Sequence, residues 1–159
     1  MDSNSIAKKA YGLALRRVAS RETSCLEMRD YLSRKEIPKE IVEATIQELV
    51  ADGSLNDERY ARCLIRTLAR NGKGPVQLQS ALRKKGVEKT LSQVKAVLSQ
   101  EVDEWNEEEL AARTVARRYP NAAKDPKIYR RAYQALLRRG FTSETIRKCL
   151  GSFPGSRGT

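Results

Sequence analysis

The sequence predicts an all-α protein in which about nine helices form three tandem three-helix repeats, giving an elongated and curved molecule. Apolar residues recur at helical spacing along nearly the whole chain; Val42, Ile46, Leu49 and Val50, for example, fall at i, i+4, i+7 and i+8. No stretch alternates polar and apolar residues for long enough to indicate a strand. A similar short segment also returns at offsets of 50 and 54 residues.

Residues typical of helix starts precede or open most of the expected helices. Ser24 and Glu27 have the spacing of a capping box, in which a hydroxyl and a carboxylate each bind a free backbone N–H. Asn56 and Asp125 suit N-cap positions, because their side-chain oxygens accept from the first free N–H groups. Proline suits a first helical position, because it has no N–H to leave unpaired there; it occurs at Pro38, Pro75 and Pro126.

Glycines mark the expected helix ends, because they adopt the left-handed turn that stops a helix. They occur at Gly53, Gly72, Gly86, Gly140 and Gly151. Together these signals predict helices over 5–19, 24–35, 38–51, 57–70, 75–85, 88–99, 104–118, 126–139 and 143–150.

The internal repeat groups these helices in threes. Residues 32–37, 82–87 and 136–141 each read apolar, variable, basic, basic, turn, apolar. One triplet has too little core to stand alone, so the repeats are expected to stack. The predicted repeats are 1–53, 54–100 and 101–151, followed by a flexible tail over 152–159.

Positive charge is concentrated in the second and third repeats. The chain carries 31 Lys and Arg against 20 Asp and Glu, a formal charge of +11. Residues 1–53 are balanced, 54–100 carry +7 and 101–159 carry +4. An excess of this size predicts a polyanionic partner.

The helix at 57–70 predicts an ordered cationic surface. Arg59, Arg62, Arg66 and Arg70 step by three and four residues, so they share one face, with apolar residues nearly opposite. Arginine binds phosphates and carboxylates with paired hydrogen bonds. A merely solvated outer face is the alternative, as is the general preference of basic residues for helix C-termini. The other candidate contact residues are Lys73, Arg83, Lys84, Lys85, Arg117, Arg118, Arg130, Arg131, Arg138 and Arg139.

The sequence lacks the residue clusters that catalysis needs. It has no histidine, and Cys25, Cys63 and Cys149 are too far apart for a C-x-x-C metal site, so they are expected to be buried thiols. Residues 107–109 are three glutamates expected on a solvated helix face. We expect no enzymatic activity, no cofactor and no metal. No leader or membrane span is apparent, so the chain is expected in the cytoplasm.

Several motifs resemble the RecX family, the bacterial regulators of the RecA recombinase. They are the stretch from Gly53 to Ala61, then Arg66, the Lys73-Gly-Pro75 helix start, and the turn at 82–87. The segment 129–141 is also similar to that family, so the resemblance covers nearly the whole chain. The chain departs from it in the first repeat, where Glu36 stands at the usual turn glycine and Pro38 follows.

The resemblance implies a nine-helix, three-repeat protein that binds RecA and its filament on single-stranded DNA. RecX proteins limit filament extension, ATPase, strand exchange and co-protease activity, and some members have the opposite effect. We expect a monomer with a role in recombination, DNA repair and the SOS response. The basic surface is expected to contact either RecA or DNA. The alternative is a stand-alone DNA-binding module with helix-turn-helix-like units, although no RNP-like aromatic pair is apparent.

Overall fold

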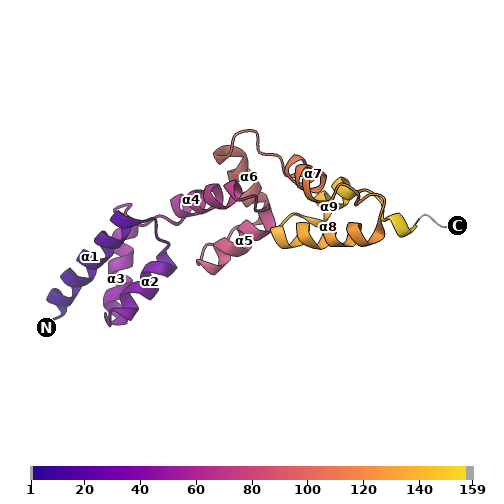
Figure 1. Cartoon of the computed structure of the whole chain (residues 1–159). Helices are drawn as coiled ribbons and strands as arrows, with labels where there is room; N and C mark the ends of the chain where they lie inside the picture. Colours follow the sequence, from indigo (N-terminus) through magenta and orange to yellow (C-terminus); the bar gives the residue numbers. More distant parts are fainter. Residues whose placement is uncertain (1, 157–159) are drawn as a thin grey trace. The chain divides into compact units, whose positions relative to one another are not determined.

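A computed structural model describes residues 2–156, and these residues form nine α-helices, one short 3₁₀ helix and no strand (Figure 1). The prediction of an all-α protein is therefore confirmed. The α-helices are α1 (Ser3–Ser20), α2 (Cys25–Arg34), α3 (Lys39–Ala51), α4 (Asp57–Arg70), α5 (Pro75–Lys84), α6 (Leu91–Glu101), α7 (Glu107–Arg118), α8 (Pro126–Arg139) and α9 (Ser143–Leu150), and η1 (Pro154–Ser156) is the 3₁₀ helix.

Most helix starts follow the local capping signals. The Asn56 side chain accepts from the Arg59 N–H at 3.0 Å, and Asp125 accepts from the first turn of α8. Pro75 and Pro126 open their helices, whereas Pro38 is the N-cap of α3. The Ser24 hydroxyl caps α2, but the Glu27 carboxylate bonds to Arg21 at 3.1 Å.

Three helix starts differ from the expected ones by two or three residues, and a side-chain cap explains each. Thr90 and Gln93 form a full capping box, so α6 begins at Leu91 and extends to Glu101. The Asn106 side chain accepts from the Glu109 N–H at 2.9 Å, which places the start of α7 at Glu107. Asp2 caps α1 in the same way, so that helix begins at Ser3.

Helix ends carry left-handed residues, as the turn signals predict. All five glycines expected at helix ends have a φ between 71° and 92°. At the corresponding place in the first repeat, Glu36 adopts φ 60°, and it is exposed. The first turn therefore keeps the geometry of the glycine turns, although a side chain is present.

Replacing Glu36 with glycine should raise the free energy of unfolding by about 1 kcal/mol. A left-handed residue with a Cβ carries a cost of roughly 1–2 kcal/mol, and the added freedom of glycine in the unfolded chain offsets part of the gain. Chemical denaturation measures the difference. Ser33→Gly, inside α2, is the control and should lower stability, and a Glu36→Gly variant less stable than the parent would contradict the prediction.

The described residues form two compact units by their internal contacts. Unit 1 contains residues 2–63 and 82–88, and unit 2 contains 64–81 and 89–156. Helices α4 and α5 therefore contribute residues to both units. The two units do not coincide with the three predicted repeats, whose boundaries remain predictions.

Unit 1 is built around the triplet α1–α3. Its core includes Ala10 and Ala14 from α1, Met28 and Leu32 from α2, and Leu49 from α3, all without exposed surface. Alanines on α1 let the neighbouring helices approach closely. A Cβ on Gly86 would lie 2.8 Å from the Leu26 Cβ, so the turn after α5 packs directly on α2.

Unit 2 has its main core in the triplet α7–α9. Ala111, Ala132, Leu136, Phe141 and Ile146 have at most 1 % exposed surface. After α9, the Phe153 ring packs edge-on against the Tyr129 ring at 5.4 Å between centroids. The segment expected as a tail thus makes contacts at Phe153, and residues 157–159 lie outside the described part of the chain.

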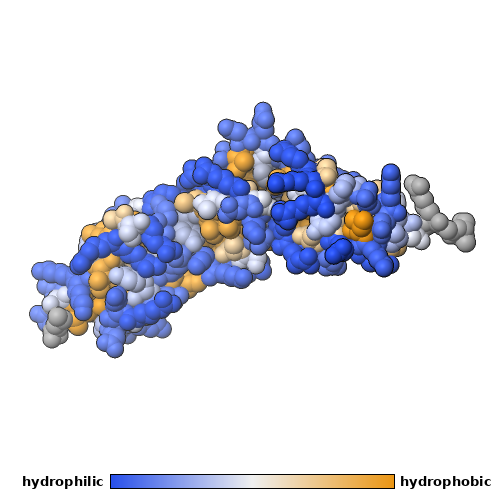
Figure 2. All heavy atoms as spheres, viewed as in Figure 1, coloured by the Kyte–Doolittle hydropathy of each residue, from blue (hydrophilic) through white to orange (hydrophobic). Residues whose placement is uncertain are grey.

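Hydrophilic residues cover most of the visible face, with smaller apolar areas between them (Figure 2). Leu15, Val50, Val76 and Leu137 are the large apolar residues that the described surface exposes. Within residues 2–156, no helix has the length and apolar character needed to cross a bilayer.

Candidate nucleic-acid interface

The structure divides the predicted cationic residues between the two units. Unit 1 holds Arg59, Arg62, Arg83, Lys84 and Lys85. Unit 2 holds Arg66, Arg70, Lys73, Arg117, Arg118, Arg130, Arg131, Arg138 and Arg139. Helix α4, which carries Arg59, Arg62, Arg66 and Arg70, contributes to both groups.

Arg59 already uses its guanidinium inside unit 1. Its Nε donates to the Glu22 carboxylate at 2.8 Å, and its two Nη atoms donate to the carbonyls of Gly53 and Ser54, both at 3.0 Å. These bonds tie the turn before α4 to the residues before α2. In the same predicted stripe, Arg66 pairs with Glu101 at 3.7 Å. Both side chains thus have structural partners within their own unit.

Three predicted arginines of unit 2 come together in one pocket. Arg117 and Arg118 at the end of α7 and Arg139 at the end of α8 line a cavity of about 310 Å³ with Arg113. We call these four residues and the cavity the arginine pocket. Its other lining residues are Asn71, Gly72, Leu110 and Thr114. A Cβ on Gly72 would lie 3.6 Å from an Arg139 Nη atom, so the turn after α4 borders this guanidinium closely.

The arginine pocket holds cationic groups without protein partners. Arg113 pairs with Glu109 at 3.3 Å. No hydrogen bond or ion pair joins the side chains of Arg117, Arg118 or Arg139 to another residue within 2–156. Each guanidinium carries five N–H donors in a planar fork that fits a phosphate or carboxylate. The pocket is therefore suited to binding an oxyanion.

Sequence reasoning missed Arg113. Arg113 belongs to no adjacent basic pair and stands between uncharged residues. The signal that could have found it is its i, i+4 spacing to Arg117, which places both on one face of α7.

Helix α8 supplies a second cationic surface in unit 2. Its sequence contains five basic residues and no acidic one. Arg130, Arg131 and Arg138, all predicted contact residues, are exposed on it, as is Lys127. A helix of this composition attracts anions along its length.

The three cysteines, expected to be buried, are half-buried, and the thiols of Cys25 and Cys149 are not activated nucleophiles. Burial raises the pKa of the Cys25 thiol to about 11, and the Asp57 carboxylate adds to this shift. Burial, with help from Glu108 and Glu107, also raises the pKa of the Cys149 thiol. Both thiols are thus protonated at neutral pH. Residues 2–156 contain no group of three His, Cys, Asp or Glu side chains that is arranged to hold a metal.

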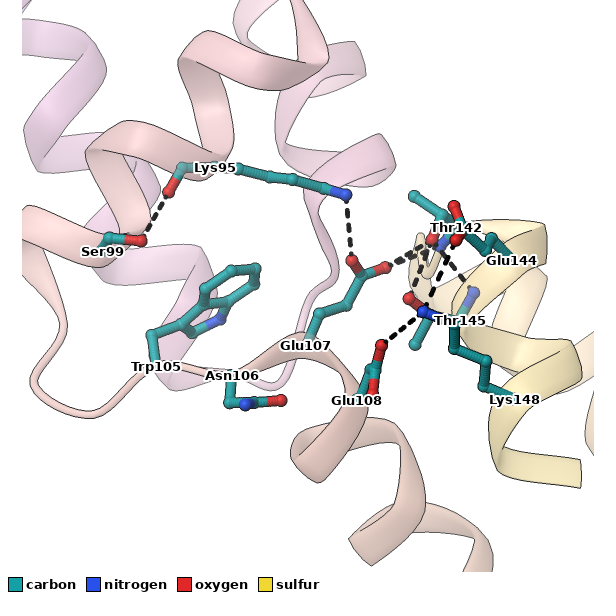
Figure 3. A pocket seen from close by; sticks show the side chains of 10 residues that line it. All are labelled: Lys95, Ser99, Trp105, Asn106, Glu107, Glu108, Thr142, Glu144, Thr145 and Lys148. Atoms are coloured by element: carbon teal, nitrogen blue, oxygen red, sulfur yellow. Dashed lines mark hydrogen bonds and ion pairs between the residues drawn. The ribbon is translucent and has the colours of Figure 1, made fainter.

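Another hollow in unit 2 corrects the expectation for Glu107, which is 7 % exposed and does not lie on a solvated face. Its carboxylate accepts from the backbone N–H and the hydroxyl of Thr142, both at 2.9 Å, and pairs with Lys95 at 3.3 Å. Figure 3 shows these side chains converging from α6, α7 and the start of α9. Glu107 therefore links three elements, a role that depends on partners distant in sequence.

Three family models match the chain in succession. They describe the first, second and third three-helix domains of RecX and match residues 10–49, 56–93 and 106–150. The predicted three-repeat organisation is thus confirmed.

Curated relatives and solved structures agree with these matches. The regulatory protein RecX of Trichlorobacter lovleyi is 34% identical over 143 residues, which cover 87% of this chain and 91% of the relative. That of Acidithiobacillus ferrooxidans is 34% identical, with 88% of this chain and 87% of the relative covered. A crystal structure of a regulatory protein RecX is 25% identical, with a TM-score of 0.74 and 92% and 72% coverage. RecX from Lactobacillus salivarius, at 24% identity, shares the fold with a TM-score of 0.75 and 92% and 96% coverage. The chain therefore belongs to the RecX family of regulatory proteins.

Proposed function

We propose that this chain is a non-enzymatic regulator that binds RecA and its filament on single-stranded DNA. In this proposal it inhibits filament extension, and with it the ATPase, strand-exchange and co-protease activities. It acts as a cytoplasmic monomer and takes part in recombination and the SOS response. Membership of the RecX family supports this role, and the resemblance of the sequence motifs to that family implies RecA as the partner.

The observation that carries the proposed contact is the arginine pocket with its unpartnered guanidiniums. An arginine with a structural role donates hydrogen bonds to carboxylates or carbonyls of the same chain, as Arg59 does. Within the described residues, no protein group accepts from the guanidiniums of Arg117, Arg118 and Arg139, so their N–H donors face solvent. In the filament, we propose that they bind phosphates of the DNA.

RecA-catalysed ATP hydrolysis on single-stranded DNA tests this role directly. The full chain should lower the rate of hydrolysis, because a filament whose extension is limited contains fewer active RecA subunits. Electron microscopy should then show shorter filaments, or added density along them. A folded protein that leaves both hydrolysis and filament length unchanged would contradict the proposal.

The second candidate is a DNA-binding module that acts without RecA. Helix α8, which has five basic residues and no acidic one, favours this function. Inhibition of an unrelated DNA-dependent ATPase, measured beside inhibition of RecA, distinguishes the two functions. If the chain inhibits that enzyme equally, and added free DNA relieves both inhibitions in parallel, the DNA-only function holds. Inhibition confined to RecA supports the regulator.

A further inference from the structure

An aromatic group beside the cationic surface of α8 lines a separate opening in unit 2. Tyr129, Tyr133, Arg130 and Gln134 come from α8, and Phe153 comes from the segment after α9. The opening has a volume of about 520 Å³ and a mainly apolar wall. We call it the aromatic pocket. It shares no lining residue with the arginine pocket.

The rings of this pocket are held in place by their neighbours. Tyr129 is 8 % exposed, and its hydroxyl donates to the Gly151 carbonyl at 3.0 Å. Phe153 meets it edge-on, and the Tyr133 ring lies 21° from parallel to the Tyr129 ring with 6.4 Å between centroids. Tyr133 is only half-buried, so part of its ring faces the opening. The pocket thus offers a preformed aromatic surface rather than a mobile side chain.

The polar groups of the pocket indicate what kind of molecule would lie on these rings. The Arg130 guanidinium lies over the Phe153 ring, 5.0 Å from its centroid, and its N–H donors fit a phosphate. The exposed Gln134 amide can both donate and accept at the edge of such a group. Exposed Lys127, Arg131 and Arg138 continue the positive charge along α8.

A nucleobase with its phosphate matches both the aromatic rings and the cationic groups of this surface. Every nucleotide has a base, with a flat face that stacks on an aromatic ring and a polar edge, and an anionic phosphate. Bases in a duplex have their faces covered by neighbours, so only single-stranded nucleic acid presents them. An apolar peptide segment would match the rings but would leave the cations of α8 without partners.

We propose that the aromatic pocket is a stacking site for a base of single-stranded DNA, with Tyr133 as its accessible ring and Arg130 on the adjoining phosphate. This inference rests on the proposed contact with filament DNA. It adds a base-dependent component to binding, which phosphate contacts in the arginine pocket do not provide.

Fluorescence anisotropy of two labelled oligonucleotides of equal length, oligothymidylate and an abasic strand, tests the stacking site. The full chain should bind the base-containing strand about tenfold more tightly, since stacking on one aromatic side chain is worth about that factor. Tyr133→Ala should lose this preference, whereas Tyr133→Phe should keep it. Thermal unfolding of both variants confirms that unit 2 remains folded. As an independent readout, an iododeoxyuridine strand should cross-link at Tyr133 or Phe153.

The outcomes separate this inference from the proposed function. Equal affinity for both strands, or an unchanged preference in folded Tyr133→Ala, would overturn the stacking site while RecA inhibition still supports the regulator. Loss of RecA inhibition by Tyr133→Ala with oligonucleotide binding unchanged would assign the pocket to protein contact and overturn it too. A chain that binds neither oligonucleotide nor filament refutes both.

Discussion

A variant with Arg117, Arg118 and Arg139 all replaced by glutamate should bind single-stranded DNA on the order of 100-fold more weakly than the parent chain. An arginine that neutralises a phosphate of a single strand contributes about 0.7 to the slope of log affinity against log salt. Losing three such contacts lowers that slope by about 2. Anisotropy titrations over a range of salt concentrations give both quantities, and inhibition of RecA hydrolysis should fall in parallel.

A matched control shows whether location matters more than total charge. Lys9, Arg16 and Arg34 are exposed cations of unit 1, and replacing them with glutamate changes the net charge by the same amount. This control should retain the parent's RecA inhibition and most of its DNA affinity. If the two triple variants weaken binding equally, the arginine pocket is not the contact site and the interaction depends only on net charge.

Replacing Gly74 with alanine should lower the free energy of unfolding of unit 2 by about 3 kcal/mol, through crowding and lost hydrogen bonds. The Gly74 N–H donates to the Arg139 carbonyl at 2.7 Å, and the Val76 N–H donates to the Gly140 carbonyl at 2.9 Å. A Cβ on Gly74 would lie 2.5 Å from the Gly140 carbonyl oxygen. Backbone faces backbone there, so no side-chain rotation relieves the clash.

Calorimetry or urea unfolding measures this loss, and Gly12→Ala is the control. Gly12 lies within α1, and a Cβ there would have no heavy atom within 4 Å. That substitution should raise stability by roughly 0.5–1 kcal/mol, because alanine favours the helix. A Gly74→Ala variant as stable as the parent would show that α5 can move away from the α8–α9 turn without cost. Arg139 adjoins that turn, so Gly74→Ala should also weaken anion binding in the arginine pocket.

No sequence motif indicates the aromatic pocket, although its residues form a candidate binding site in the structure. The sequence contains no aromatic pair in the spacing of a known RNA-binding motif, so base stacking had no support there. Tyr129 and Tyr133 are one helical turn apart and look like ordinary core residues. Only the return of the chain after α9 places Phe153 beside them. In the sequence, the presence of Phe153 in a segment expected to be a flexible tail was the available sign that this segment packs on the protein.

The sequence by itself determined the helices, their caps and the location of positive charge along the chain, because these depend on residues within a few positions of each other. The tertiary structure decided which charged side chains lie close together. In it, the Arg59 guanidinium donates to a carbonyl of the turn before α4, and Glu107 is buried between three elements. It also brings Arg113, Arg117, Arg118 and Arg139 to one pocket. Such groupings depend on contacts between residues far apart in the chain, and no local pattern records which helix faces will pack together.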